Sequence, residues 1–187
     1  MIELVFNGQH AANGLLVTES GYVLTSQHCV EDNLLPGLKV KDHRNKVYEI
    51  EKVHVRGKGE LDIALIKADI PQKDIARQYR FYDLQEDHFA VAAFGRRDGL
   101  AVKKYGFAKK VNRVVGYNFP DGAPGDSGGM IATPNSEIMA VLCGKTLGYE
   151  TDDGRIHDGG LYPVFAVPLL KTVDLINFYK RRLESRL

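Results

Sequence analysis

The sequence has few cysteines, and it also lacks a long apolar run and an excess of either charge. Only Cys29 and Cys143 occur among 187 residues, too few for a disulfide framework and too far apart for a CxxC metal or redox motif. We expect two reduced thiols that fill space rather than a single bridge. This expectation favours a reducing compartment.

No apolar run approaches the roughly 18 residues that span a bilayer. The segment Met1–Gly14 lacks the basic start and the cleavage site of a signal peptide. Lysine plus arginine total 25 against 24 acidic residues, a net charge of +1, which gives no general attraction for nucleic acid or an acidic membrane. We therefore expect a cytoplasmic protein without a nucleic-acid or membrane partner.

The composition is that of an ordinary globular domain. Apolar residues make up 44% and charged residues 26% of the chain, which is enough to build a sizeable core. At about 100 to 200 residues per domain, the length fits one domain or two small joined halves. Nineteen glycines and seven prolines are spread without a period, as in chains of many short strands joined by turns.

Short apolar segments bounded by glycine, asparagine, aspartate or serine predict strands along most of the chain. None of them is long enough to predict a helix, so the pattern favours an all-β fold. The predicted strands are Ile2–Phe6, Leu15–Thr18, Tyr22–Thr25, Val47–Val55, Ile63–Ile66, Phe89–Phe94, Val111–Val115, Met130–Thr133, Ile138–Cys143 and Leu161–Val167.

One of these strands changes its apolar phase. Between Ile50 and Val53 the alternation slips by one residue, which would turn the buried face of the strand outward. A β-bulge at Glu51 or Lys52 would absorb the extra residue and bend the strand.

The end of the chain has a different pattern. After Pro168, apolar residues recur at spacings of three and four, and the segment finishes in Lys180, Arg181 and Arg182. Proline in the first turn and cations in the last turn are helix signals. The sequence therefore predicts a C-terminal amphipathic helix over 168–187.

Three short motifs carry chemically useful side chains. His28 stands in the motif LTSQHC at the end of an apolar strand, Asp62 opens the segment DIALI, and Ser127 lies between glycines in GDSGG. Taken alone, His28 would more often be a hydrogen-bonded structural histidine than a catalyst. Together the three residues meet the needs of a serine nucleophile: a base within reach, and a third group that orients the base.

The order His28, Asp62, Ser127 is that of the chymotrypsin arrangement, and subtilisin-like and α/β-hydrolase enzymes have other orders. With these motifs, the chain from about Gly14 to Val167 resembles the trypsin/chymotrypsin-like serine proteases. It looks most like the small, loop-trimmed bacterial and viral members and the protease domain of HtrA-type enzymes. A domain of a viral or bacterial polyprotein is therefore a second possible setting.

The resemblance implies two antiparallel six-stranded β-barrels packed side by side, with a C-terminal α-helix. The implied division is an N-terminal barrel at 1–75 that carries the histidine and the aspartate, and a connection at 76–88. A C-terminal barrel at 89–167 carries the serine, and the helix follows at 168–187.

The resemblance also implies a mechanism. Ser127 would attack a peptide carbonyl, His28 would take its proton and return it to the leaving amine, and Asp62 would orient the imidazole. The N–H groups of Gly125 and Ser127 would form the oxyanion hole. We therefore expect a serine endopeptidase that acts on proteins or peptides, with no metal and no cofactor. The alternative is a protease-like peptide-binding module that is latent or inactive.

Further positions resemble the substrate-binding residues of the family. Asp121 lies six residues before Ser127, where the trypsin-like branch has the base of its specificity pocket, and a carboxylate there favours Arg or Lys. Gly160 and Tyr162 resemble the small wall residue and the aromatic of that pocket. Leu142, Cys143 and Gly144 resemble part of the strand that pairs with the substrate in this family.

Two observations leave the specificity open. Asp121 also fits a plain structural turn, since it stands in the sequence Phe-Pro-Asp-Gly. Lys145 ends the segment that resembles the substrate-pairing strand beside the pocket, and a cation there would repel a basic side chain of the substrate. A preference for a small or apolar side chain is therefore the competing expectation.

Asp126 needs a partner that the sequence does not identify. In zymogen-activated members of the family, a freed N-terminal amine pairs with the acid that Asp126 resembles. No N-terminal motif of that kind is visible in the sequence. We therefore expect either another group to hold Asp126 or a different contact to order the oxyanion loop.

A basic stretch and the remaining histidines are interpreted more simply. We expect the basic stretch to be a solvated hairpin face rather than part of a nucleic-acid-binding barrel, which is a third interpretation of the chain. The histidines show no metal-ligand spacing such as HExxH. The basic residues are Lys103, Lys104, Lys109, Lys110 and Arg113, and the histidines are His10, His43, His54, His88 and His157.

Overall fold

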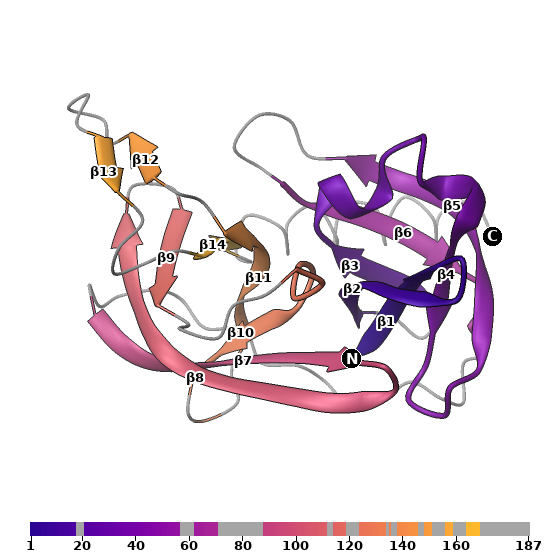
Figure 1. Ribbon diagram of the computed structural model, residues 1–187, viewed down its shortest axis with the longest axis horizontal. Coiled ribbons are helices and arrows are strands. Elements are labelled where there is room, and N and C mark those ends of the chain that lie inside the picture. Colours follow the sequence, from indigo (N-terminus) through magenta and orange to yellow (C-terminus); the bar gives the residue numbers. More distant parts are fainter. Residues whose placement is uncertain are drawn as a thin grey trace, which may run out of the picture.

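The computed structural model describes residues 1–17, 21–56, 62–70, 88–111, 114–118, 124–133, 135, 138–145, 148–150, 156–158 and 164–168. Their strands form two closed antiparallel barrels of six strands each (Figure 1). The expected two-barrel all-β fold is confirmed. The expected C-terminal helix lies outside the described residues, apart from Pro168, which ends a strand.

The first barrel closes in the order β1-β2-β3-β6-β5-β4. Two short 3-10 helices, η1 and η2, connect β3 to β4. The strands are β1 (Ile2–Phe6), β2 (Gln9–Leu16), β3 (Tyr22–Thr25), β4 (Leu38–Lys41), β5 (Val47–Arg56) and β6 (Ala64–Ala68), and the helices are η1 (Gln27–Val30) and η2 (Leu35–Gly37).

The second barrel closes in the order β10-β11-β14-β9-β8-β7, and β12 and β13 form a separate two-stranded sheet. Most of the expected connection at 76–88 lies outside the described residues. The strands are β7 (His88–Arg97), β8 (Leu100–Val111), β9 (Val114–Asn118), β10 (Met130–Ala132), β11 (Ile138–Lys145), β12 (Gly148–Glu150), β13 (Ile156–Asp158) and β14 (Val164–Pro168).

Alternating side chains fill the first barrel. In β4, Leu38 and Val40 are buried while the lysines next to them are partly exposed, as the two-residue period of a strand requires. The predicted bulge is confirmed, because the pairing of β5 with β6 shifts register between Ile50 and Lys52. A second shift follows between Val53 and Val55.

The β7–β8 hairpin was only partly predicted. The segment Val111–Val115, expected to be one strand, is instead the end of β8 and the beginning of β9. β8 begins at Leu100 and pairs with the whole of β7. All of β8 before Val111 was missed, because lysine pairs interrupt the apolar pattern there.

The turn between β7 and β8 has only two residues. Asp98 and Gly99 both have positive φ, at 52° and 83°, which is the conformation of a type I′ hairpin turn. This tight turn extends from the second barrel toward the first (Figure 1).

An apolar cluster packs residues of both barrels together. Leu15, Leu24 and Ile63 come from the first barrel, and all three are buried against residues of the second. Their partners are Met130, Ile138 and Val141. Within the part of the chain that is described, no helix has the length and apolar character needed to cross a membrane.

Candidate active site

His28 and Asp62 come together at one end of the first barrel. His28 lies in η1, directly after β3, and Asp62 lies just before β6, the strand that pairs with β3. The Nδ1 atom of His28 is 2.6 Å from Oδ2 of Asp62, and the main-chain N–H of His28 donates to Oδ1 at 2.9 Å. One residue thus engages both oxygens of the carboxylate.

This contact sets the charge and orientation of the imidazole. The hydrogen bond with Asp62 is the largest cause that raises the pKa of His28 to about 10; the neighbouring Cys29 thiol also raises it and burial opposes the rise. In the neutral ring, a hydrogen on Nδ1 that faces Asp62 leaves Nε2 as the acceptor. With 44% of its side chain exposed, His28 can meet a substrate at the surface.

The loop that carries Ser127 is bound beside the segment that carries His28. Ser26, two residues before His28, accepts a hydrogen bond from the Gly128 N–H at 3.1 Å and donates to the Leu142 carbonyl at 2.9 Å. Gly128 has a φ of 75°, and a Cβ there would lie 1.9 Å from the Asn13 carbonyl oxygen. A residue without a side chain is therefore required directly after Ser127.

Side chains and a main-chain N–H of β2 hold carbonyl groups of the serine loop. The Gly125 carbonyl accepts hydrogen bonds from Nδ2 of Asn13 and is contacted by Nε2 of His10, each at 2.9 Å. The Asn13 N–H donates to the Ser127 carbonyl at 2.7 Å. Asn13 is itself oriented, because its Oδ1 accepts a hydrogen bond from the Arg96 N–H at 2.5 Å.

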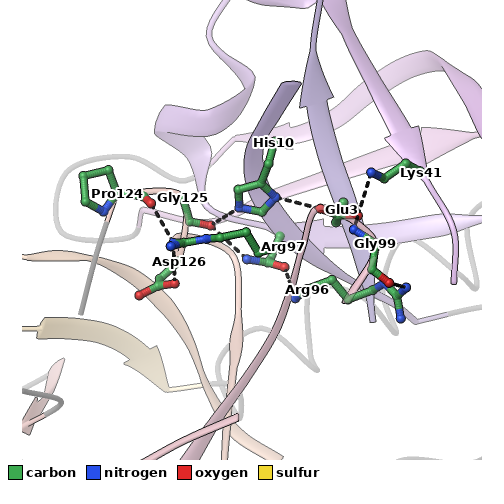
Figure 2. Close-up of polar contacts among 10 residues, drawn as sticks. Glu3, His10, Lys41, Arg96, Arg97, Gly99, Pro124, Gly125 and Asp126 are labelled. Atoms are coloured by element: carbon green, nitrogen blue, oxygen red, sulfur yellow. Dashed lines mark hydrogen bonds and ion pairs between the residues drawn. The ribbon is translucent and has the colours of Figure 1, made fainter. Parts of the chain in front are cut away.

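Asp126 is held by two cations of the β7–β8 hairpin. Nη2 of Arg97 lies 3.1 Å from Oδ1, and Nζ of Lys104 lies 2.6 Å from Oδ2. The same Arg97 nitrogen donates to the Pro124 carbonyl at 2.9 Å (Figure 2). These cations are the partners that Asp126 was expected to need.

This finding corrects the interpretation of the basic stretch. Lys104 is not part of a solvated face, since it is only 18% exposed and pairs with Asp126. Lys103 lies over the rings of Phe94 and Tyr105, 5.1 and 4.8 Å from their centroids. Alternation along β8 separates the two lysines, because neighbouring side chains of a strand point to opposite faces.

Glu3 is fully buried, and His10 lies between it and Gly125 of the serine loop (Figure 2). Its carboxylate is 3.0 Å from Nζ of Lys41, accepts the Gly99 N–H at 2.9 Å, and lies 2.9 Å from Nδ1 of His10. Although burial alone would raise the pKa of Glu3, these hydrogen bonds bring it below the ordinary 4.5. Because His10 also contacts the Gly125 carbonyl, the ring connects Glu3 to the serine loop.

The predicted substrate-binding residues are only partly described. Asp121, Gly160 and Tyr162 lie outside the described residues. Cys143 and Gly144 lie in β11, where the pairing with β14 shifts register between Leu142 and Gly144.

Leu142 is buried, and its main chain binds the serine loop. Its N–H donates to the Gly129 carbonyl at 2.8 Å, and its carbonyl accepts from the Gly128 N–H at 2.6 Å. The Ser26 hydroxyl donates to the same carbonyl. These bonds tie the main chain of Leu142 to the serine loop, and the role of Leu142 in substrate binding stays a prediction.

Sequence reasoning did not find the residues that hold the loop. Asp126 signalled that a cation was needed but did not indicate which one. His10 was considered only for metal-ligand spacing, and nothing marked Glu3 or Asn13. Among the described residues, no group of three or more His, Cys, Asp or Glu side chains could hold a metal ion.

Two closed barrels, with a histidine–aspartate pair on one and a glycine-flanked serine on the other, define the chymotrypsin-like class of serine proteases. A family model described as Trypsin matches residues 1–162. The chain therefore belongs to the trypsin family and is a trypsin/chymotrypsin-like serine endopeptidase.

Solved structures of proteases are similar in fold. The MamO protease domain from Magnetospirillum magneticum, in its apo form, has a TM-score of 0.68 and 18% identity over 92% of this chain and 93% of that one. For Kallikrein-related peptidase 10 the TM-score is 0.71, with 16% identity over 97% of this chain and 95% of that one. For a serine endoprotease from Yersinia pestis the TM-score is 0.66, with 18% identity over 96% of this chain and 62% of that one. No curated protein is significantly similar in sequence.

Replacing Glu3 with glutamine should destabilise the fold at neutral pH by about 3 kcal/mol, because it removes one charge from a buried ion pair. The pKa of Glu3 is lowered in the folded chain. Its stabilisation is therefore complete above the unfolded value and is lost as pH falls through the folded value. Chemical denaturation should show the free energies of unfolding of wild type and Glu3→Gln converging below about pH 4.

Glu49→Gln is the matched control, because Glu49 is 72% exposed and pairs with Lys39 at the surface. Its effect should stay below about 1 kcal/mol. If the Glu3→Gln deficit does not change with pH, the charge of Glu3 does not stabilise the fold.

Proposed function

We propose that this protein cleaves peptide bonds through a triad of His28, Asp62 and Ser127 and an acyl-enzyme intermediate. The 2.6 Å contact between His28 and Asp62 carries the proposal. This contact occupies Nδ1 of His28 and leaves Nε2 as the base. Ser26 links the segments that carry His28 and Ser127.

In this mechanism, the Ser127 hydroxyl attacks the carbonyl carbon of the peptide while Nε2 of His28 takes its proton. The imidazolium is stabilised by Asp62 and gives the proton to the leaving amine. A water molecule then attacks the acyl-enzyme with His28 again as the base. The N–H groups of Gly125 and Ser127 stabilise the oxyanion, and each donor is worth about 3 kcal/mol.

For the substrate, the proposal favours a basic side chain before the scissile bond, bound by Asp121. Because the main chain of Leu142 is used by the serine loop, pairing with the substrate backbone falls to Cys143 and Gly144. The acyl group then lies between Ser127 and this strand.

Ser127→Ala should abolish peptide hydrolysis and labelling by a fluorophosphonate, since both need the hydroxyl. Thermal unfolding should remain close to that of the wild type, because the Ser127 contact to Asn13 is made by the main chain. Mass spectrometry of the labelled wild type should place the adduct on Ser127. A folded wild type that neither cleaves nor reacts would indicate the latent peptide-binding module instead.

The pH dependence tests the role of Asp62. Activity needs neutral His28, and its pKa is raised from 6.5 to about 10, so kcat/KM should rise with pH with a midpoint above 6.5. Asp62→Asn should lower this midpoint and reduce kcat about 10,000-fold, because the wrong tautomer is then favoured. Asp69→Asn is the control, because Asp69 is exposed and directly follows β6, the strand that Asp62 precedes; it should leave the pH profile unchanged. Equal pH profiles for the wild type and both variants would exclude the triad.

A peptide library with every residue type before the scissile bond tests the specificity. The expected result is cleavage after arginine and lysine, and Asp121→Ser should reduce kcat/KM for these substrates about 100-fold while sparing apolar ones. Preferred cleavage after small or apolar side chains by the wild type would reject the basic pocket.

A further inference from the structure

We propose that Arg97 is a positioning residue that directs the Gly125 N–H toward the oxyanion. The inference rests on the proposed function, because it concerns the same hole. It follows from one contact that accompanies the ion pair to Asp126: Nη2 of Arg97 donates to the Pro124 carbonyl at 2.9 Å (Figure 2).

The contact matters because the peptide between Pro124 and Gly125 is a single planar unit. In a trans peptide the C=O and N–H bonds point in opposite directions, and the described residues contain no cis peptide bond. A donor that holds the Pro124 carbonyl on one side therefore holds the Gly125 N–H on the other. Arg97 thus acts on this donor without touching the substrate.

The second donor of the hole is held in a different way. The Ser127 N–H shares its peptide plane with the Asp126 carbonyl, which accepts the Gly129 N–H at 3.0 Å. That bond is local and belongs to the main chain, so no side-chain substitution removes it. The Gly125 donor instead depends on a side chain from the end of β7, and it is the more easily lost of the two.

The peptide that follows Gly125 is held by other residues, so it does not depend on Arg97. The Gly125 carbonyl is contacted by both His10 and Asn13, each at 2.9 Å. The plane that follows Gly125 is therefore fixed from the first barrel, and the plane before it is fixed from the hairpin. Glycine between them allows the two planes to be set independently, because its backbone is the least restricted.

The Arg97 side chain is held both at its guanidinium and at the main chain from which it extends. Its Nη2 also contacts Oδ1 of Asp126 at 3.1 Å, and Arg97 directly precedes the two-residue turn. The N–H of Gly99 in that turn is bound by Glu3, and the N–H of Arg96 is bound by Asn13. The anchored turn therefore places the guanidinium over the Pro124 carbonyl.

A matched pair of variants separates this role from simple charge neutralisation. Arg97→Met and Lys104→Met each remove one cation from Asp126, and Arg97→Met also removes the donor to the Pro124 carbonyl. Arg97→Met should lower kcat about 10- to 100-fold with little change in KM, a part of the loss expected for a whole oxyanion donor. It should weaken a peptide aldehyde inhibitor, whose adduct carries the oxyanion, by a similar factor.

Lys104→Met removes a cation from Asp126 but no donor from the Pro124 carbonyl, so it should lower both quantities by a clearly smaller factor than Arg97→Met does. Equal losses in the two variants would overturn the inference, since Arg97 would then act only as a charge partner. Thermal unfolding checks that both variants fold. If Arg97→Met does not fold, Arg97→Gln takes its place, with the same expected losses.

A crystal structure of the Arg97 variant tests the inference without activity. The expected result is a rotated peptide between Pro124 and Gly125, with this peptide unchanged in Lys104→Met. An unrotated peptide would overturn the role of Arg97 even if the wild type hydrolyses peptides. Conversely, a wild type without hydrolysis or Ser127 labelling would reject the proposed function and with it the oxyanion, while the peptide orientation would still decide whether Arg97 orients the Gly125 N–H.

Discussion

The buried charge of Glu3 is the constraint on which the arrangement between the barrels depends. A carboxylate removed from water costs several kcal/mol unless charges and hydrogen bonds replace the solvent. Its replacements come from three elements: Lys41 of β4, His10 of β2 and the Gly99 N–H of the β7–β8 turn. Satisfying one charge in the first barrel therefore fixes a hairpin of the second barrel against it.

The same arrangement organises the serine loop without help from the substrate. Asn13 binds carbonyl groups of the loop on both sides of Asp126, and the hairpin cations bind the Asp126 carboxylate. Preorganised donors are the largest source of rate acceleration in many enzymes, because they need not reorient as charge develops. The stability of the interface and the readiness of the site thus come from one set of contacts.

Much of the fold could be predicted because its signals are local. The bulge beside Glu51 follows from one slip in apolar alternation, and the three motifs around His28, Asp62 and Ser127 are short and ordered. The partners of Asp126 could not be predicted, because Arg97 and Lys104 are distant in sequence and look like ordinary surface cations. Asn13 is similar: its role arises only when two barrels close and meet.

The two-residue turn at Asp98 and Gly99 has a consequence for how this sequence can vary. Surface turns usually tolerate insertions, because nothing depends on their length. Here one added residue would displace the Gly99 N–H from Glu3 and the preceding guanidinium from the Pro124 carbonyl. Loop length at this turn is thereby coupled to catalysis, so a protein engineer should graft new loops elsewhere on the scaffold.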